Sequence, residues 1–238
     1  MKIYWTSLTA FAVFATLAAL VVVLGRGASP VVERAYWIWN FHDLSYADSD
    51  AEVIIYQGDV DSNWGFQDRG VNPHPLAHEE RVTLLFRLYT LAGPPKDIAD
   101  HYFYLKRRWE RYGVAVMGLQ IDYDSPTSRL GEYRQWLQEL REELSDELLS
   151  ITTLATYVFD APAVLLEVSS EVDYLAMQLY RGYAPHADYW EVVKFLRSSG
   201  VRHRVGVTLS PDFPTDNDLC GRHCLGIAVF LNQQGPNL

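Results

Sequence analysis

The sequence predicts an α/β fold, a compact (β/α)8 barrel of the TIM-barrel type in one domain, with some of its helices reduced to loops. Eight short runs are rich in β-branched, aromatic and aliphatic residues and are bounded by turn formers. These candidate strands span residues 35–40, 53–57, 81–89, 114–124, 148–157, 174–180, 204–210 and 226–232. Amphipathic helices separate several of them, as parallel neighbouring strands require.

Apolar residues at helical spacing predict helices over residues 98–112, 130–144 and 189–196. No regular helix is expected after the first, second and seventh strands. An open, doubly wound sheet is the alternative arrangement of the same elements. Such a sheet usually has a glycine-rich phosphate loop after its first strand, and the sequence WNFHDLSYADSD at 39–50 has none. The barrel is therefore favoured.

Residues 1–28 form a separate segment ahead of the predicted domain, which covers residues 29–238. Lys2 gives a positive start, and residues 3–24 are almost wholly apolar. This length suits a signal peptide or a single membrane anchor of ~20 residues. We therefore expect an exported protein that is periplasmic, or anchored to the inner membrane through this segment and facing outward.

The composition argues against several classes of partner and cofactor. The formal net charge is -10, whereas a nucleic-acid partner needs clustered Lys and Arg. Cys220 and Cys224, the two cysteines, favour a short disulfide in an exported protein, with a zinc site that includes His223 or two free thiols as alternatives. No nucleophile elbow, Walker loop or HExxH motif is present, so we expect no cofactor and no metal.

The chemistry is predicted at the end of the fourth strand, in GLQIDYD (118–124). Gln120, Asp122 and Asp124 alternate along the strand and so share one face, with Asp124 nearest the carboxyl end. Active sites of barrels lie at that end. Two carboxyls ~6.5–7 Å apart at Cβ resist ionising together. One of them should have a raised pKa and serve as a general acid, although an Asp at position 124 could instead cap the next helix.

The same stretch resembles the strand-four signature G-x-D-x-D-[W/Y]-E of chitinase-type glycoside hydrolases of family 18. The longer string QIDYDSPTSRLGEYRQWLQELR resembles a bacterial domain of unknown function, DUF3142, and QLY at 178–180 resembles the Q-x-Y strand of the family 18 enzymes. The resemblance implies that Asp124 is the acid, that Asp122 orients or stabilises, and that Tyr180 with Gln178 positions the sugar. Gln120, the remaining substrate-binding candidate on this strand, stands where the family has its first Asp.

Asp124 stands where the family has a Glu, and its shorter arm ends ~1.3–1.5 Å further from the same substrate oxygen, a displacement that costs ~10²-fold unless the backbone compensates. Two carboxylates acting conventionally on another glycan are the alternative to the family's mechanism, in which the substrate's acetamido group takes part.

Four more residues are candidates for substrate binding, because we expect them near the carboxyl ends of the barrel strands. Arg87 ends the third strand and could bind substrate or pair with one of the two aspartates. Trp37 and Trp39 on the first strand could form a floor for sugar stacking, with core packing as the alternative for one of them. Tyr157 is expected at the end of the fifth strand.

These observations predict a glycoside hydrolase that acts on an extracytoplasmic polysaccharide or oligosaccharide, including cell-envelope glycan, through a strand-four carboxylate pair. A catalytically inactive carbohydrate-binding barrel is the alternative, and the replacement of Glu by Asp at position 124 favours it. A scaffold domain at the membrane is a third hypothesis, and it predicts a mouth filled with large apolar side chains.

Overall fold

The protein is described by a computed structural model over residues 32–231, except residues 50, 62, 64 and 75–80. The predicted export or anchor segment, residues 1–28, lies outside this range. Among the residues that are described, no helix has the length and apolar character needed to cross a membrane.

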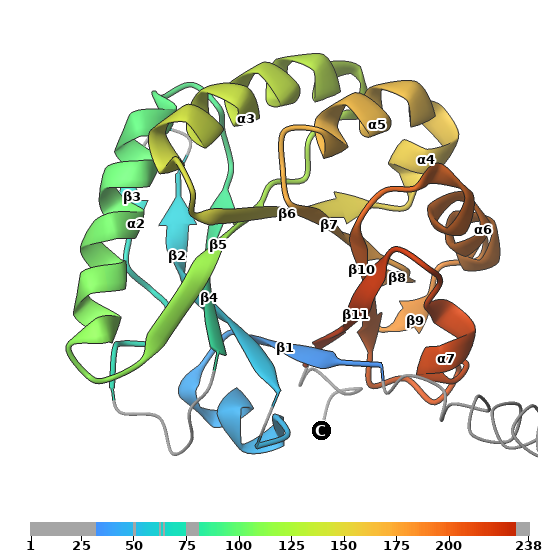
Figure 1. Cartoon of the computed structure of the whole chain (residues 1–238), viewed down its shortest axis with the longest axis horizontal. Coiled ribbons are helices and arrows are strands. Elements are labelled where there is room, and N and C mark those ends of the chain that lie inside the picture. The colour runs from blue at the N-terminus through green and yellow to red at the C-terminus, as the bar shows by residue number, and fades with distance from the viewer. Residues whose placement is uncertain (1–31, 50, 62, 64, 75–80, 232–238) are drawn as a thin grey trace, which may run out of the picture. The chain divides into compact units, whose positions relative to one another are not determined.

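Eight parallel strands close into a barrel (Figure 1). Around the barrel they follow the order β1-β11-β10-β7-β6-β5-β4-β2, and parallel pairing of β1 with β2 completes the ring. In chain order the strands are β1 (Arg34–Ile38), β2 (Glu52–Val60), β4 (Arg81–Leu88), β5 (Ala115–Asp122), β6 (Leu148–Leu154), β7 (Tyr174–Gln178), β10 (His203–Thr208) and β11 (Cys224–Phe230). Each overlaps one predicted strand, so the barrel prediction is confirmed and the open sheet is excluded.

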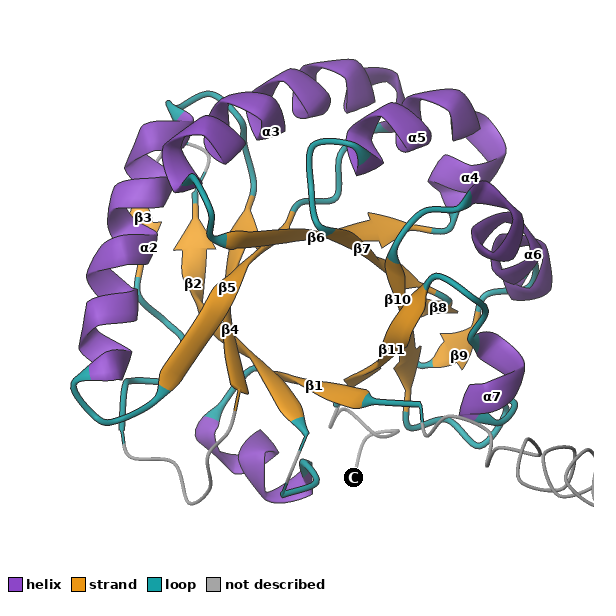
Figure 2. Ribbon diagram, in the orientation of Figure 1, coloured by secondary structure: helices purple, strands orange, loops and turns teal. Residues whose placement is uncertain are grey.

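The helices lie outside the barrel, in an arc that runs from α2 to α7 (Figure 2). They are α2 (Pro95–Glu110), α3 (Leu130–Leu144), α4 (Thr156–Asp160), α5 (Pro162–Ser169), α6 (Tyr189–Ser199) and the single turn α7 (Asp216–Leu219). Shorter elements are the 3-10 helices η1 (Phe41–Tyr46) and η2 (Thr127–Arg129), and the strands β3 (Phe66–Gln67), β8 (Tyr180–Arg181) and β9 (Ala184–Pro185). As predicted, β1 and β2 are followed by reduced elements, and the seventh barrel strand is followed by only one helical turn.

The alternation along β5 follows from its two faces. Leu119 and Ile121 belong to the large apolar core between the barrel and its helices. Gln120 and Asp122 point the other way, into the barrel, where a smaller apolar cluster around Trp37 fills the interior. Both faces of a barrel strand are buried, and here polar side chains occupy the inner one.

An ion pair closes the interior near the amino-terminal ends of the strands, which we call the base of the barrel. Arg204 on β10 donates to Glu52 on β2 at 2.6 Å, and both side chains are less than a tenth exposed. Thr83 on β4 donates to the second oxygen of the same carboxylate at 2.9 Å. The guanidinium of Arg204 also lies over the ring of Tyr174, 5.4 Å from its centroid.

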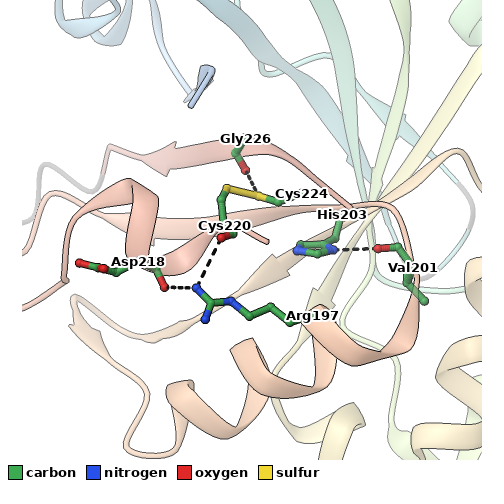
Figure 3. The surroundings of a disulfide bond; sticks show 7 residues. All are labelled: Arg197, Val201, His203, Asp218, Cys220, Cys224 and Gly226. Atoms are coloured by element: carbon green, nitrogen blue, oxygen red, sulfur yellow. Dashed lines mark hydrogen bonds between the residues drawn. A yellow bond between two sulfur atoms is a disulfide. The ribbon is translucent and has the colours of Figure 1, made fainter. Parts of the chain in front are cut away.

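Cys220 and Cys224 form a disulfide that joins the end of α7 to the start of β11 (Figure 3). Arg197 on α6 donates to the main-chain oxygens of Asp218, at 2.6 Å, and of Cys220, at 3.4 Å, so the bridged segment is also tied to the helix before it. The sulfurs therefore bond each other rather than a metal. In the described part of the chain, no three His, Cys, Asp or Glu side chains are grouped to hold a metal ion.

Candidate functional site

A partly enclosed cavity of about 130 Å³ lies at the carboxyl ends of the strands, which we call the mouth of the barrel. Strands or strand ends from around the ring contribute to this central cavity, because parallel strands all end at the same rim. Its lining residues are Trp37, Trp39, Leu85, Arg87, Asp122, Asp124, Thr152, Gln178, Tyr180 and Phe230. The mouth therefore brings together seven of the nine residues singled out in the sequence.

Asp122 is buried, with 5% of its surface exposed, and is held by two neighbours. The hydroxyl of Thr152 on β6 donates to its Oδ1 at 2.6 Å, and Nε of Arg87 on β4 lies 3.4 Å from its Oδ2. Burial raises the pKa of Asp122 and the nearby Asp124 charge adds to the increase, whereas Thr152 and Arg87 act to lower it. The raised pKa expected for the general acid thus belongs to the inner carboxyl, Asp122, whereas the resemblance assigns the acid to Asp124.

Asp124 lies further out, just beyond the end of β5, and is exposed. It makes no hydrogen bond or ion pair with any residue that the structure describes. The capping positions of η2 and α3 are Pro126 and Arg129, so Asp124 caps neither helix. Its carboxyl lines the cavity with its hydrogen-bonding capacity free for a ligand.

Arg87 links the carboxylate pair to the aromatic wall. Its guanidinium lies over the ring of Trp39, 5.5 Å from the centroid, and 6.0 Å from that of Tyr89. The pairing with Asp122 that the sequence left open is thus present, and the side chain still lines the cavity. Arg87 can therefore hold Asp122 and contact a ligand from one position.

Tyr180 and Gln178 enter the cavity from the end of β7. Tyr180 was predicted to be the last residue of this strand. The strand instead ends at Gln178, and Tyr180 is the first residue of the short strand β8. The ring of Tyr180 stacks on Phe230 of β11, with centroids 5.4 Å apart and planes 13° apart. Burial, with Asp122 and Asp124 nearby, raises the pKa of Tyr180, so its hydroxyl stays protonated and able to donate.

Gln120 does not line the cavity, in contrast to its predicted role in binding substrate. It is fully buried one layer below Asp122, and its Oε1 accepts a hydrogen bond from Nε1 of Trp37 at 3.1 Å. Trp37 in turn contributes to the cavity floor and packs against Phe230, with centroids 6.2 Å apart. The amide thus supports the floor.

Tyr157 is also placed differently from the prediction. β6 ends at Leu154, and Tyr157 lies in α4, almost fully buried in the outer core. Its hydroxyl donates to the main-chain oxygen of Ser125 at 2.7 Å. Tyr157 therefore fixes the backbone directly after Asp124 rather than contacting a ligand.

Three lining residues were not singled out in the sequence: Leu85, Thr152 and Phe230. Thr152 carried a usable signal, because Ser150 and Thr152 alternate along β6 as Gln120 and Asp122 do along β5. Leu85 and Phe230 are apolar residues in apolar strands, and nothing in the sequence separates them from core residues.

Comparisons with known proteins agree with the fold and with part of the resemblance. Residues 91–197 match the model of a family described as Domain of unknown function (DUF3142). The structure is similar to the catalytic domain of a family GH18 chitinase from the fern Peteris ryukyuensis, with a TM-score of 0.50 and 13% sequence identity over 82% of this chain and 90% of that one. No curated protein matches the chain. The predicted resemblance to DUF3142 and to the barrel of the family 18 enzymes is confirmed, and at 13% identity the likeness to the chitinase is one of fold.

Proposed function

We propose that this protein is a glycoside hydrolase that acts on a polysaccharide or cell-envelope glycan outside the cytoplasm. The observation that carries the proposal is the pair Asp122 and Asp124, which line one cavity at the mouth of the barrel beside Tyr180. One carboxyl is buried and the other is exposed. Two carboxyls in unlike environments are what acid and base catalysis on a glycosidic bond requires.

Asp124 is the proton donor in this proposal on the ground of its position, since the raised pKa of the pair is that of Asp122. It is the outer carboxyl of the pair, where the glycosidic oxygen of an incoming chain arrives first, and no neighbour among the described residues occupies its oxygens. A positioned general acid contributes ~10²–10⁴-fold to a rate. Proton transfer from Asp124 to the leaving oxygen lets the bond between that oxygen and the anomeric carbon break as positive charge develops on the sugar ring. A water molecule then bonds to the anomeric carbon and gives up a proton, which returns Asp124 to its acid form.

Asp122 stabilises that positive charge, either directly or through a neighbouring group of the substrate. Thr152 and Arg87 hold it in place, and both oppose the effect of burial, which favours its neutral form. Tyr180 and Gln178 position the sugar from the end of β7, which lies beside β6, with the Tyr180 hydroxyl as a donor. Four of the ten lining residues are aromatic and five are polar or charged, a mixture that suits a ligand with both ring faces and hydroxyl groups.

The location outside the cytoplasm is supported by two features. The apolar run near the amino terminus has the composition of an export signal or anchor. The Cys220–Cys224 disulfide is of the kind that persists in oxidising compartments.

The first test replaces the proposed acid. We expect Asp124→Asn to lower the release of new reducing ends from a panel of polysaccharides and peptidoglycan by ~10²-fold or more, because the general acid is lost. The thermal midpoint should change little, since Asp124 is exposed and has no partner in the described part of the chain. Asp146→Asn is the matched control, because Asp146 is also exposed but lies just before β6, at the base of the barrel. Full activity of Asp124→Asn would exclude the assignment.

A non-catalytic carbohydrate-binding barrel is the second candidate. It is favoured by the Asp at the position of the family's Glu, and by Gln120, which is neutral and engaged by Trp37. The variant Asp124→Glu separates the hydrolase from the non-catalytic barrel, because it restores the longer side chain of the family's Glu. If a protein that binds glycans without cleaving them gains cleavage with this change, the native chain is the binder. If native cleavage falls with the same change, the backbone is adjusted to the Asp.

A further inference from the structure

A second cavity adjoins the first on the side of β1 and β2. This outer groove has a volume of about 410 Å³ and shares Trp39 with the central cavity. It is lined by Trp39, Asn40, Phe41, Arg69, Gly70, Val71, Asn72, Pro73 and His74. Trp39 is thus the residue that the described linings of the two cavities have in common.

The wall that carries Trp39 and Phe41 is held in place by a buried carboxylate. Oδ2 of Asp43, which is 1% exposed, accepts hydrogen bonds from the backbone N–H groups of Trp39 at 2.9 Å and Asn40 at 3.2 Å. The Asn40 side chain caps η1 by accepting from the N–H of His42 at 3.0 Å. Trp39 and Phe41 are thus presented by a fixed turn.

The opposite wall, Gly70 to His74, is tied to the middle of β2. The N–H groups of Gly70 and Val71 donate to the carbonyls of Gln57, at 3.2 Å, and Tyr56, at 3.0 Å. A Cβ on Gly70 would collide with the backbone of Tyr56, so this close approach requires glycine. Both walls are therefore preformed, which reduces the entropic cost of binding.

The chemistry of the groove suits a sugar ring. Phe41 is 66% exposed, and its ring lies 4.8 Å from the imidazole of His74, so an aromatic face is open to solvent beside the groove. Two asparagine amides and the guanidinium of Arg69 lie beside it, although the Asn40 amide oxygen is taken by the cap of η1 and Arg69 also contacts Gln67 and lies 3.9 Å from Asp59. The described lining contains no carboxylate although the chain as a whole is strongly acidic, which favours a neutral or acidic unit.

We infer that the outer groove is a second binding subsite, which takes a neutral or acidic sugar unit of the same linear glycan whose cleaved bond lies in the central cavity. This inference rests on the proposed function and specifies its substrate as an oligomer. A ring in the groove would lie on Phe41 and His74, while Trp39 forms the partition across which the chain continues. Affinity should therefore depend on chain length.

The test measures binding in the Asp124→Asn background, so that no ligand is cleaved. Calorimetry would give Kd for oligomers of β-1,4-linked N-acetylglucosamine and of peptidoglycan glycan, each from one to six units. We expect affinity to rise with length, and Phe41→Ala to weaken binding of the long oligomers by about tenfold while leaving the single unit unchanged. Tyr112→Ala is the matched control, because Tyr112 is 51% exposed but precedes β5 at the base of the barrel.

The outcomes separate the two proposals. If oligomers bind with no dependence on length, or if Phe41→Ala affects one unit and six units equally, the groove is not a subsite and the proposed function is unaffected. If no glycan binds and none is cleaved by the native chain, the proposed function fails and the groove assignment falls with it.

Discussion

The two ends of the barrel interior carry the same three groups and use them differently. At the base, a carboxylate, Glu52, receives the guanidinium of Arg204 at 2.6 Å and the hydroxyl of Thr83 at 2.9 Å. At the mouth, Asp122 receives Nε of Arg87 at 3.4 Å and the hydroxyl of Thr152 at 2.6 Å.

The difference lies in what surrounds each set. The arginine at the base is 7% exposed, whereas the arginine at the mouth is 38% exposed and lines the central cavity. The ion pair at the base of the barrel can interact only with the protein, so its role is structural. Asp122, Arg87 and Thr152 at the mouth can also interact with a ligand. Access to a cavity, rather than the identity of the groups, thus distinguishes the two roles, as is general for the two ends of such barrels.

The largest effect should come from breaking the ion pair between Arg204 and Glu52 at the base of the barrel. Arg204→Met leaves Glu52 buried without its charge partner, and we expect a loss of ~3–5 kcal/mol in the free energy of unfolding, measured by urea denaturation. If the single variant does not fold, the double variant Arg204→Met with Glu52→Leu should recover most of the loss, because both charges are removed. Arg87→Met at the mouth is the comparison and should cost far less, since Arg87 is partly in water. Equal losses at both ends would remove the distinction.

The matched threonines sharpen the comparison. Thr83→Val and Thr152→Val each delete one hydrogen bond to a buried carboxylate, and each should lower the free energy of unfolding by ~1.5–3 kcal/mol. The Thr152 hydroxyl also lowers the pKa of Asp122, so its loss should raise that pKa further. If Asp122 acts as the anion, the acidic limb of the pH profile for glycan cleavage should move to higher pH in Thr152→Val alone. A similar shift in Thr83→Val would contradict the separation of the two ends.

The period of two along the strands was sufficient to predict much of the site. It placed Asp122, Asp124 and Arg87 on the inner face near the mouth, and the structure finds all three in one cavity. Periodicity identifies the face of a residue but not its depth. Gln120 has the right face, yet it lies one layer too deep and binds Trp37.

Other features could not be predicted because they depend on irregular backbone. The segment LATY at 154–157 is rich in β-formers, and only the tertiary structure shows that Tyr157 has turned into α4. The outer groove joins Phe41 with residues 69–74, two loop segments that have no period of their own. The second segment is held by hydrogen bonds from Gly70 and Val71 to the carbonyls of Gln57 and Tyr56 in the middle of β2, and these bonds have no sequence signature.

The smallest expected effect concerns the free energy of unfolding that is lost by keeping the carboxyl of Asp122 buried at the mouth. The folded pKa of Asp122 is raised above its unfolded value of ~3.9, so the folded protein retains a proton that the unfolded chain releases, and stability falls as the pH rises through that interval. An asparagine side chain cannot titrate. The variant Asp122→Asn should therefore gain stability relative to the native chain as the pH rises from the unfolded pKa of ~3.9 to the raised folded pKa, and the gain should be constant above it.

Urea denaturation of both proteins across this range measures the difference, and titration of all other groups cancels in the comparison. A difference that stays constant with pH would mean that Thr152 and Arg87 fully offset the burial of Asp122. The contrast between the two ends of the barrel would then rest on exposure alone.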